Sequence, residues 1–425
     1  MWILKLGGDF LNNRIAWRKM EKKGGAVYGH PAFTYYRACP ICNNIDSRPV
    51  WGLKQFQFFI DNASLSKQID INVHQCNDCY ALYMNPNYTQ LGFEHLFSLA
   101  SCSYGSFDFD FRVNEEIEWL KQRDLLKPNI HVLDVGCYKG DFLNYLPGYT
   151  RCTGVDIDKT AIDMAQSRYG SSRMNFICAD FESFQLTDFP DLITMFHVLE
   201  HLPNPLNVLT KLRELADKNT QLVIEVPIIE NGFTNDINGF FSVQHMTHFS
   251  RNSLRNITQI AGWRIEEMFE QKDYNGCRVV CKPDIQNCDI TRNINEISLC
   301  YQYLSHWYQN IVNIENVLKG HLDNNQWVIW GAGLHTEFIF QVSSFFLGAG
   351  NEREYIIIDN DKGKQGKSWR SINIYSPDAL RGIELDKVKF LISSYGSQTS
   401  IEDYLLQEGV PQENIVKLYE QLRVY

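Results

Sequence analysis

The sequence predicts an α/β protein of several parts, in which a doubly wound parallel sheet ends in an antiparallel hairpin. Three observations predict this fold. Short apolar segments alternate with amphipathic segments over residues 129–284, a second alternation of this kind fills residues 326–425, and a cysteine-bearing segment precedes both. The hairpin follows from the apolar segments WRIEEMFEQ and CRVVCKP, which a short turn with Asn275-Gly276 separates. A chain of 425 residues also exceeds what one hydrophobic core usually organises.

Composition and charge restrict the class of protein. With 44% hydrophobic and 21% charged residues the chain is typical of a globular protein, and no apolar run approaches the ~20 residues that span a bilayer. The net charge of -10 provides no general attraction to a phosphate backbone. The first residues are too briefly apolar for a secretion signal. We therefore expect a cytoplasmic protein, a monomer or a homodimer, without nucleic-acid or membrane partners.

Two CxxC pairs near the N-terminus predict a metal site. Cys39 and Cys42 form the first pair, Cys76 and Cys79 the second, and 33 residues lie between the pairs. Four thiolates can complete the tetrahedron of a Zn²⁺ ion and leave no position for substrate, so the ion would be structural. Two unrelated thiol pairs or a redox CxxC are the alternatives.

The first strand of the central segment leads into a glycine turn. Asp134 precedes Gly136 and Gly140, which are four residues apart, and a helix follows. Glycines allow the backbone to turn tightly beneath a ligand. A nicotinamide site would need a third glycine and a pyrophosphate, which the carboxylate of Asp134 would repel. The same carboxylate suits the cationic methionyl end of S-adenosylmethionine (SAM).

The ends of the next three strands carry further candidate ligands. Asp156, followed by Ile157, can accept hydrogen bonds from both ribose hydroxyls. Asp180 can accept from the adenine amino group, and the ring of Phe181 can lie against the purine. His197 stands at the mouth of the fourth strand, where we expect it to line the cofactor pocket. Each aspartate taken alone is also typical of a helix cap.

Together these segments resemble the class I SAM-dependent methyltransferases, in the order and spacing of that family and over about 155 residues. The resemblance implies a Rossmann-like sheet and an enzyme that transfers the methyl group of SAM. Tyr138 departs from the pattern, since many members of the family have glycine there.

The whole arrangement is similar to a narrower family. An N-terminal four-cysteine module, a central SAM domain and a C-terminal Rossmann-like domain resemble the bacterial deoxysugar C-methyltransferases, as do the strings at residues 134–143, 328–333 and 358–366. The resemblance implies a nucleotide-linked sugar as substrate. In the C-terminal domain Thr336 occupies the third glycine position of a dinucleotide fingerprint, so we expect a domain that shapes the substrate cleft and does not bind NAD.

The same resemblance suggests catalytic residues. His245 matches that family's catalytic histidine, and imidazole can accept a proton near neutral pH. Gln244 and Ser242 replace the family's usual glutamate and tyrosine, and Tyr104 lies where the family supplies another aromatic hydroxyl. A structural alternative is that His245 and His248 only orient a loop through hydrogen bonds.

The predicted function is SAM-dependent methylation of a sugar, nucleotide-linked or on a glycan precursor, at carbon or oxygen, with His245 as the candidate base. Because that family's glutamate and tyrosine are replaced here, O-methylation stays open. An RNA methyltransferase with a zinc module and a non-catalytic SAM-binding assembly protein are the alternatives.

We divide the chain into a lead-in without a readable motif, a zinc-binding module, a helical connector, a SAM-binding domain, a linker helix and a C-terminal Rossmann-like domain. These parts are expected at residues 1–37, 38–82, 83–128, 129–284, 285–325 and 326–425, in that order.

Overall fold

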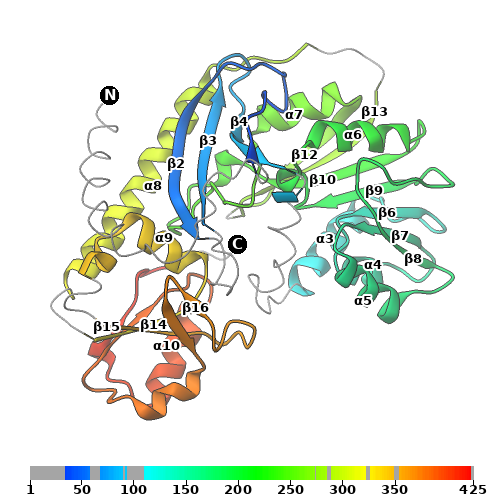
Figure 1. Ribbon diagram of the computed structural model, residues 1–425. Coiled ribbons are helices and arrows are strands. Elements are labelled where there is room, and N and C mark those ends of the chain that lie inside the picture. The colour runs from blue at the N-terminus through cyan, green and yellow to red at the C-terminus, as the bar shows by residue number, and fades with distance from the viewer. Residues whose placement is uncertain are drawn as a thin grey trace.

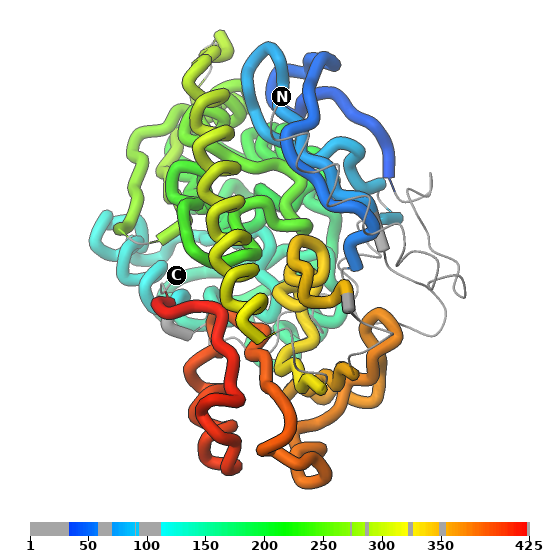
Figure 2. The backbone as a smooth tube through the Cα atoms, turned by 90° about the vertical axis from the view of Figure 1, so that its left-hand side faces the viewer, coloured from blue at the N-terminus to red at the C-terminus, as the bar shows by residue number. Residues whose placement is uncertain are grey.

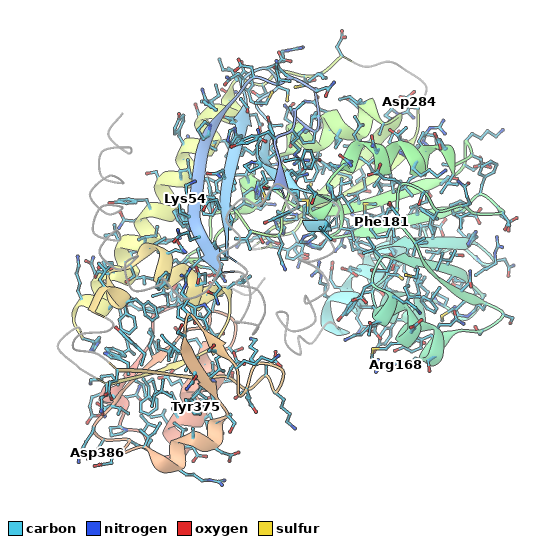
Figure 3. All side chains as sticks on the ribbon, viewed as in Figure 1. Lys54, Arg168, Phe181, Asp284, Tyr375 and Asp386 are labelled. Carbon is cyan, nitrogen blue, oxygen red and sulfur yellow. The ribbon has the colours of Figure 1, made fainter. Side chains whose placement is uncertain are left out.

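A computed structural model shows three packed parts, each with its own sheet (Figure 1). The residues that it describes are 34–57, 68–89, 91–92, 110–272, 274–284, 289–321, 326–348 and 354–422. Among the residues that Figure 3 labels, Lys54 lies on the long strand of the cysteine module, Phe181 in the central domain and Tyr375 in the C-terminal domain.

The central sheet has seven strands and confirms the predicted doubly wound fold. In sheet order its strands are β12 (Trp263–Glu270), β13 (Gly276–Pro283), β10 (Gln221–Pro227), β9 (Leu192–Phe196), β6 (His131–Val135), β7 (Arg151–Asp156) and β8 (Met174–Cys178). The strands from β10 to β8 are parallel, whereas β13 runs antiparallel to both of its neighbours. The sheet therefore ends in the expected hairpin.

Helices cover both faces of this sheet because neighbouring strand residues point in opposite directions. Val132 of β6 packs in one apolar core with helices α3, α4 and α5, and the next residue, Leu133, packs in another core with α6 and α7. The helices are α3 (Asp110–Gln122), α4 (Asp141–Tyr145), α5 (Lys159–Tyr169), α6 (Pro205–Glu214) and α7 (Arg251–Ile260). Sequence periodicity predicted all five, to within a few residues at their ends.

The cysteine module forms an antiparallel sheet that takes a strand from the central region. Strands β2 (Ser47–Gln57), β3 (Gln68–Cys76) and β4 (Leu82–Met84) follow one another, and β11 (Thr247–His248) pairs with β4 as the fourth strand. A separate pair joins β1 (Thr34–Tyr35) to β5 (Asn87–Tyr88). The loop that carries His245 is thus part of the module's sheet, which no local pattern in the sequence indicated.

A long helix connects the central part to the C-terminal part, as its apolar spacing predicted. Helix α8 (Asn295–Lys319) runs alongside both of them (Figure 2). It is held to the central part by Trp307, whose indole Nε1 donates to the carbonyl of Ile237 at 2.8 Å.

The C-terminal part is a second α/β domain, as expected. Its six-stranded sheet has the order β16 (Ser368–Trp369), β17 (Ile372–Tyr375), β15 (Glu354–Ile358), β14 (Gln326–Trp330), β18 (Lys389–Ile392) and β19 (Ile415–Val416). Helices α9 (Leu334–Val342) and α10 (Gln398–Gln407) accompany it. Short 3₁₀ helices occur along the chain at η2 (Leu199–His201), η3 (Ile229–Asn231), η4 (Phe345–Gly348), η5 (Pro377–Gly382) and η6 (Gln412–Asn414).

The glycine turn of this C-terminal domain is occupied by its own side chains. The carboxylate of Asp359 accepts from the backbone N–H of Ala332 at 2.7 Å and contacts Lys364 Nζ at 3.2 Å. In a dinucleotide site such a carboxylate holds a ribose. That this domain shapes the substrate cleft and does not bind NAD stays a prediction.

None of the helices in the described part of the chain combines the length and the apolar character that crossing a bilayer requires.

Candidate functional site

The glycine turn after β6 is as tight as the sequence predicted. Gly136 and Gly140 have φ angles of +81° and +80°, in the left-handed region that favours glycine. A Cβ atom on Gly136 would lie 2.3 Å from Cγ2 of Val198, and one on Gly140 would lie 2.6 Å from Cε1 of Phe176. Tyr138, where many methyltransferases have glycine, also has a positive φ of 47°. The turn therefore keeps its shape despite this departure.

Asp156 lies at the end of β7 with its carboxylate held in place. One oxygen accepts from the backbone N–H of Tyr138 at 2.8 Å, and the other accepts from that of Asp158 at 2.9 Å. The first bond connects Asp156 directly to the glycine turn. Burial raises the pKa of this carboxyl group. The position and fixed orientation agree with the ribose-binding role predicted for Asp156.

Asp134 is buried beside this turn, on the neighbouring strand. Its carboxylate accepts a hydrogen bond of 2.7 Å from the hydroxyl of Thr194 on β9. Burial raises the pKa of Asp134 to about 7, because the charged form loses its hydration. A cationic group bound nearby would stabilise the charged form. Asp134 therefore suits the positively charged end of SAM, as predicted.

The other predicted cofactor residues lie in less distinctive surroundings. Asp180 is exposed, and one of its oxygens accepts from the backbone N–H of Glu182 at 2.8 Å, as in a local cap. The ring of Phe181 is buried in the core that includes α6 and α7, and Ile157 is partly buried. The cofactor-binding roles of these three residues stay predictions.

His197 belongs to a polar cluster beyond the ends of β9 and β10. Its Nε2 lies 3.0 Å from Glu225 Oε1 and 2.8 Å from the hydroxyl of Tyr274. Its Nδ1 lies 3.4 Å from Glu200 Oε1. The ring is thus engaged by protein groups on both sides, and its predicted place in the cofactor pocket stays untested.

Glu225 is fully buried and is held by an arginine. Arg278 on β13 contacts its second oxygen, and the hydroxyl of Tyr274 donates to its first. Arg278 also reaches Glu115 of α3, with Nη2 and Oε2 2.8 Å apart. These charges satisfy one another in a region shielded from water, so they form a rigid wall next to the site.

His245 lies beside a carboxylate from another segment. The rings of His245 and His201 meet edge to face with centroids 4.8 Å apart, and His201 Nε2 lies 3.8 Å from Glu200 Oε1. Burial lowers the pKa of His245 well below its usual value, and the neighbouring histidines lower it further. Gln244, the other predicted member of the site, accepts from His201 Nδ1 through its backbone carbonyl at 3.1 Å.

The cluster borders the glycine turn. Val198, which would collide with a Cβ atom on Gly136, lies in the same short segment as His197, Glu200 and His201. The candidate cofactor groups at the ends of β6 and β7 and the candidate catalytic groups after β9 are therefore neighbours.

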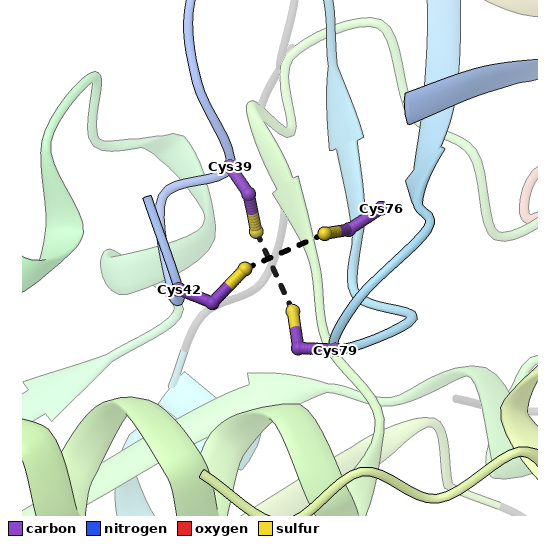
Figure 4. A group of neighbouring side chains, drawn as sticks. All are labelled: Cys39, Cys42, Cys76 and Cys79. Carbon is purple, nitrogen blue, oxygen red and sulfur yellow. Dashed lines mark hydrogen bonds between the residues drawn. The ribbon is translucent and has the colours of Figure 1, made fainter. Parts of the chain in front are cut away.

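The four cysteines converge as the sequence predicted (Figure 4). Cys39 Sγ lies 3.6 Å from Cys79 Sγ, and Cys42 Sγ lies 3.4 Å from Cys76 Sγ. Sulfur ligands around one Zn²⁺ with bonds of about 2.3 Å lie about 3.8 Å apart, so the cluster fits that ion after a small expansion. All four cysteines are free thiols. A structural zinc ion is accordingly our proposal for them.

Sequence reasoning missed several members of the cluster. The sequence indicated no site role for His201, Glu200, Tyr274 or Arg278. The one available signal was the pair Glu200-His201 directly after a predicted strand, where two adjacent ionisable residues are unusual. Tyr104 lies outside the described residues, so its predicted role is untested.

Comparison with known proteins agrees with this geometry. A family model described as a methyltransferase domain matches residues 112–268, which is less than half of the chain. A malonyl-[acyl-carrier protein] O-methyltransferase of Anoxybacillus flavithermus is 26% identical over 121 residues, which cover 28% of this chain and 47% of that protein. A ubiquinone biosynthesis O-methyltransferase of Coxiella burnetii is 33% identical over 93 residues. These cover 21% of this chain and 39% of that protein. The chain thus spans less than half the length of these relatives.

Among solved structures, magnesium protoporphyrin IX methyltransferase from Synechocystis PCC 6803 with bound SAH is 21% identical, covering 46% of this chain and 95% of that one, with a TM-score of 0.34. A putative methyltransferase from Bacillus halodurans is 19% identical and has a TM-score of 0.32. The match covers 36% of this chain and 71% of that one. The family match covers the glycine turn and the five parallel strands of the sheet, and it ends within β12. Residues 112–268 are therefore a SAM-dependent methyltransferase domain within a longer chain.

Proposed function

We propose that this protein transfers the methyl group of SAM to an oxygen or a carbon of a sugar, nucleotide-linked or on a glycan precursor. The observation that carries the proposal is the convergence of Glu200, His201 and His245 beside the glycine turn of a methyltransferase domain. The sugar acceptor rests on the resemblance of the three-part chain to deoxysugar C-methyltransferases. The two curated relatives are named O-methyltransferases of other acceptors, so they support methyl transfer and not the sugar.

The reaction needs little from the protein beyond alignment and removal of a proton. SAM supplies an electrophilic methyl group on a sulfonium, and an acceptor oxygen or carbanion attacks that group in line. His245 is the candidate base, because its ring nitrogen Nδ1 is buried and accepts no hydrogen bond from the described residues. In the deoxysugar C-methyltransferases a glutamate usually precedes the catalytic histidine, and Gln244 stands there in this chain. Glu200, from a different segment, is our candidate for the missing carboxylate.

The choice between carbon and oxygen depends on the acceptor. C-methylation needs a ketosugar, whose α-proton must leave to form an enolate, whereas O-methylation needs only a hydroxyl near His245. Ser242 does not replace the phenol that would stabilise an enolate. The absence of a phenol at Ser242 and the names of the two curated relatives, both O-methyltransferases, favour methylation at oxygen.

The direct test is a screen of nucleotide sugars and simple glycans with SAM labelled in its methyl group. His245→Ala should lower turnover at least tenfold while the calorimetric affinity for SAM changes less than twofold. His321→Ala, at the end of α8, is the control and should retain full activity. Full activity in His245→Ala would remove this residue as the base.

Two other outcomes would favour the alternatives. Tight, salt-sensitive retention of RNA on filters would favour an RNA methyltransferase, against the expectation from the net charge of -10. The absence of both heat and thermal shift on adding SAM would favour a non-catalytic assembly protein.

A further inference from the structure

We infer that Glu200, His201 and His245 bind one divalent transition-metal ion at the candidate catalytic site, separate from the four-cysteine cluster. One nitrogen or oxygen atom from each residue lies within 4.8 Å of the others. In the part of the chain that the structure describes, only these residues and the four cysteines form such a group.

The first argument is the state of Glu200. Its side chain is 1% exposed, and neither carboxylate oxygen accepts a hydrogen bond from a described residue. The nearest positively charged candidates are His197 Nδ1 at 3.4 Å and His201 Nε2 at 3.8 Å from Oε1, both beyond good hydrogen-bond geometry. A buried carboxylate in this state is costly unless a proton or a cation neutralises it, and a cation would also be a partner for its oxygens.

The second argument is the tautomer of His201. Its Nδ1 lies 3.1 Å from the carbonyl oxygen of Gln244, and a carbonyl can only accept, so Nδ1 must carry a proton. A neutral ring with the proton on Nδ1 has its lone pair on Nε2, the atom that faces Glu200. Metal-binding histidines are typically held in this way, with the second nitrogen donating to a carbonyl.

The third argument is His245, which approaches from the loop between β10 and β11. Its Nδ1 is buried and has no hydrogen-bond partner in the described residues. One ring nitrogen of His245 lies within 4.8 Å of a carboxylate oxygen of Glu200 and of a ring nitrogen of His201. A cation bound among these atoms would be a ligand partner for all three side chains.

The donor set indicates the class of ion. Two imidazoles and one carboxylate suit Mn²⁺, Fe²⁺, Co²⁺ or Zn²⁺ and leave coordination positions open, unlike the closed set of four thiolates. With bonds of about 2.1 Å, ligand atoms around one ion lie about 3.0–3.5 Å apart. Side-chain rotations that close the widest separation by up to about 2 Å would complete the site.

The open positions would take an acceptor with two adjacent oxygens, such as a sugar diol, and the ion would favour its deprotonated form. This use of the ion rests on the proposed function, whereas the ion site itself does not. With the ion bound, His245 would be a ligand and not the base. The ion would lower the pKa of the bound acceptor hydroxyl, and the proton of that hydroxyl would pass to water.

The test uses the purified full-length chain with its cysteine cluster loaded with zinc. Mn²⁺ is the probe, because it prefers nitrogen and oxygen ligands and binds thiolates poorly. Paramagnetic resonance of the free ion measures binding without SAM or acceptor. We expect about one Mn²⁺ per chain in the wild type and at least tenfold weaker binding in Glu200→Gln and in His245→Gln. Glu296→Gln, which changes a buried carboxyl group on α8, should bind Mn²⁺ like the wild type.

Circular dichroism and the zinc content of each variant show whether it is folded. Wild-type protein that binds neither Mn²⁺ nor Co²⁺ would overturn the inference, as would undiminished Mn²⁺ binding in folded Glu200→Gln and His245→Gln. Failure of every sugar acceptor would refute the proposed substrate and leave the Mn²⁺ stoichiometry unchanged, so the two failures are distinguishable.

Discussion

The backbone N–H of Met84 donates a hydrogen bond of 2.9 Å to the carbonyl of Met246. This bond connects the cysteine module to the loop that carries His245. The guanidinium of Arg37 donates to the same carbonyl at 2.6 Å, and the N–H of Met246 donates to the carbonyl of Glu200 at 2.7 Å. The module therefore supports the loop of His245 at the point where the loop meets Glu200.

This connection predicts that loss of the proposed zinc ion affects catalysis as well as folding. Cys42→Ser should lose the metal, lower the melting temperature by several degrees and lower kcat several-fold, while SAM affinity changes less than twofold. Cys178→Ser, at an exposed free thiol, is the control. Metal analysis, thermal unfolding and steady-state kinetics check the prediction, and a Cys42→Ser protein with full metal content and wild-type kinetics would contradict it.

The contact between Gly136 and Val198 predicts a partial rescue. Gly136→Ala should destabilise the protein by about 2–4 kcal/mol, because the new Cβ collides with Val198 and the positive φ is strained. Gly136→Ala/Val198→Ala should recover part of that loss, since only the collision is relieved. Chemical denaturation measures both. Equal destabilisation in the single and double variants would show that the collision contributes nothing.

Asp156 should contribute to SAM affinity more than to folding. Asp156→Ala is expected to weaken SAM binding about tenfold to a hundredfold, since hydrogen bonds to a charged group contribute roughly 1.5–3 kcal/mol. Asp163→Ala, which removes an exposed carboxylate on α5, is the matched control. Calorimetry gives the affinities. Unchanged affinity in a folded Asp156→Ala protein would mean that the ribose binds elsewhere.

The raised pKa of Asp134 predicts a pH dependence of stability. The folded-state pKa of about 7 lies above the ordinary value of 3.8, so the group's contribution to stability is present at low pH and is lost as the pH rises from about 4 through about 7. In the absence of SAM, Asp134→Asn should therefore lose less stability than the wild type between pH 5 and pH 8. Thermal unfolding across this range checks the sign.

SAM should reverse this effect, because its cationic end stabilises the charged form of Asp134. The affinity of the wild type for SAM is expected to rise with pH up to about 7, and Asp134→Asn should show no such rise. An identical pH dependence of affinity in the two proteins would separate Asp134 from the cofactor.

The ion pair between Arg278 and Glu225 predicts that single and double substitutions differ. Both side chains are buried, so Arg278→Met should cost about 3–5 kcal/mol by leaving a buried charge without its partner. Arg278→Met/Glu225→Gln should be more stable than Arg278→Met alone, because the fully buried carboxylate is removed. Glu115, the other partner of Arg278, is 30% exposed and can be hydrated. Denaturant unfolding of the two variants provides the comparison, and a less stable double variant would contradict this account.

The sequence by itself determined the central fold and the local features of the cofactor turn. Strand and helix periodicity placed the elements of both α/β parts. Asp134, Gly136, Gly140 and Asp156 became candidates because they lie at the ends of β6 and β7 or in the turn after β6. The CxxC spacing likewise predicted the cysteine cluster. Each of these patterns is local, because its residues lie within a few positions of one another or, for the cysteines, in two CxxC pairs.

Only the tertiary structure decided how the candidate catalytic site is assembled. His245 and Glu200 are 45 positions apart in the sequence. No sequence pattern predicts that the segment directly after His245 forms β11 and joins the sheet of the cysteine module. The tautomer of His201 depends on a carbonyl from that same loop. Strand pairing and side-chain packing between distant segments create these contacts, and their energies depend on the whole fold.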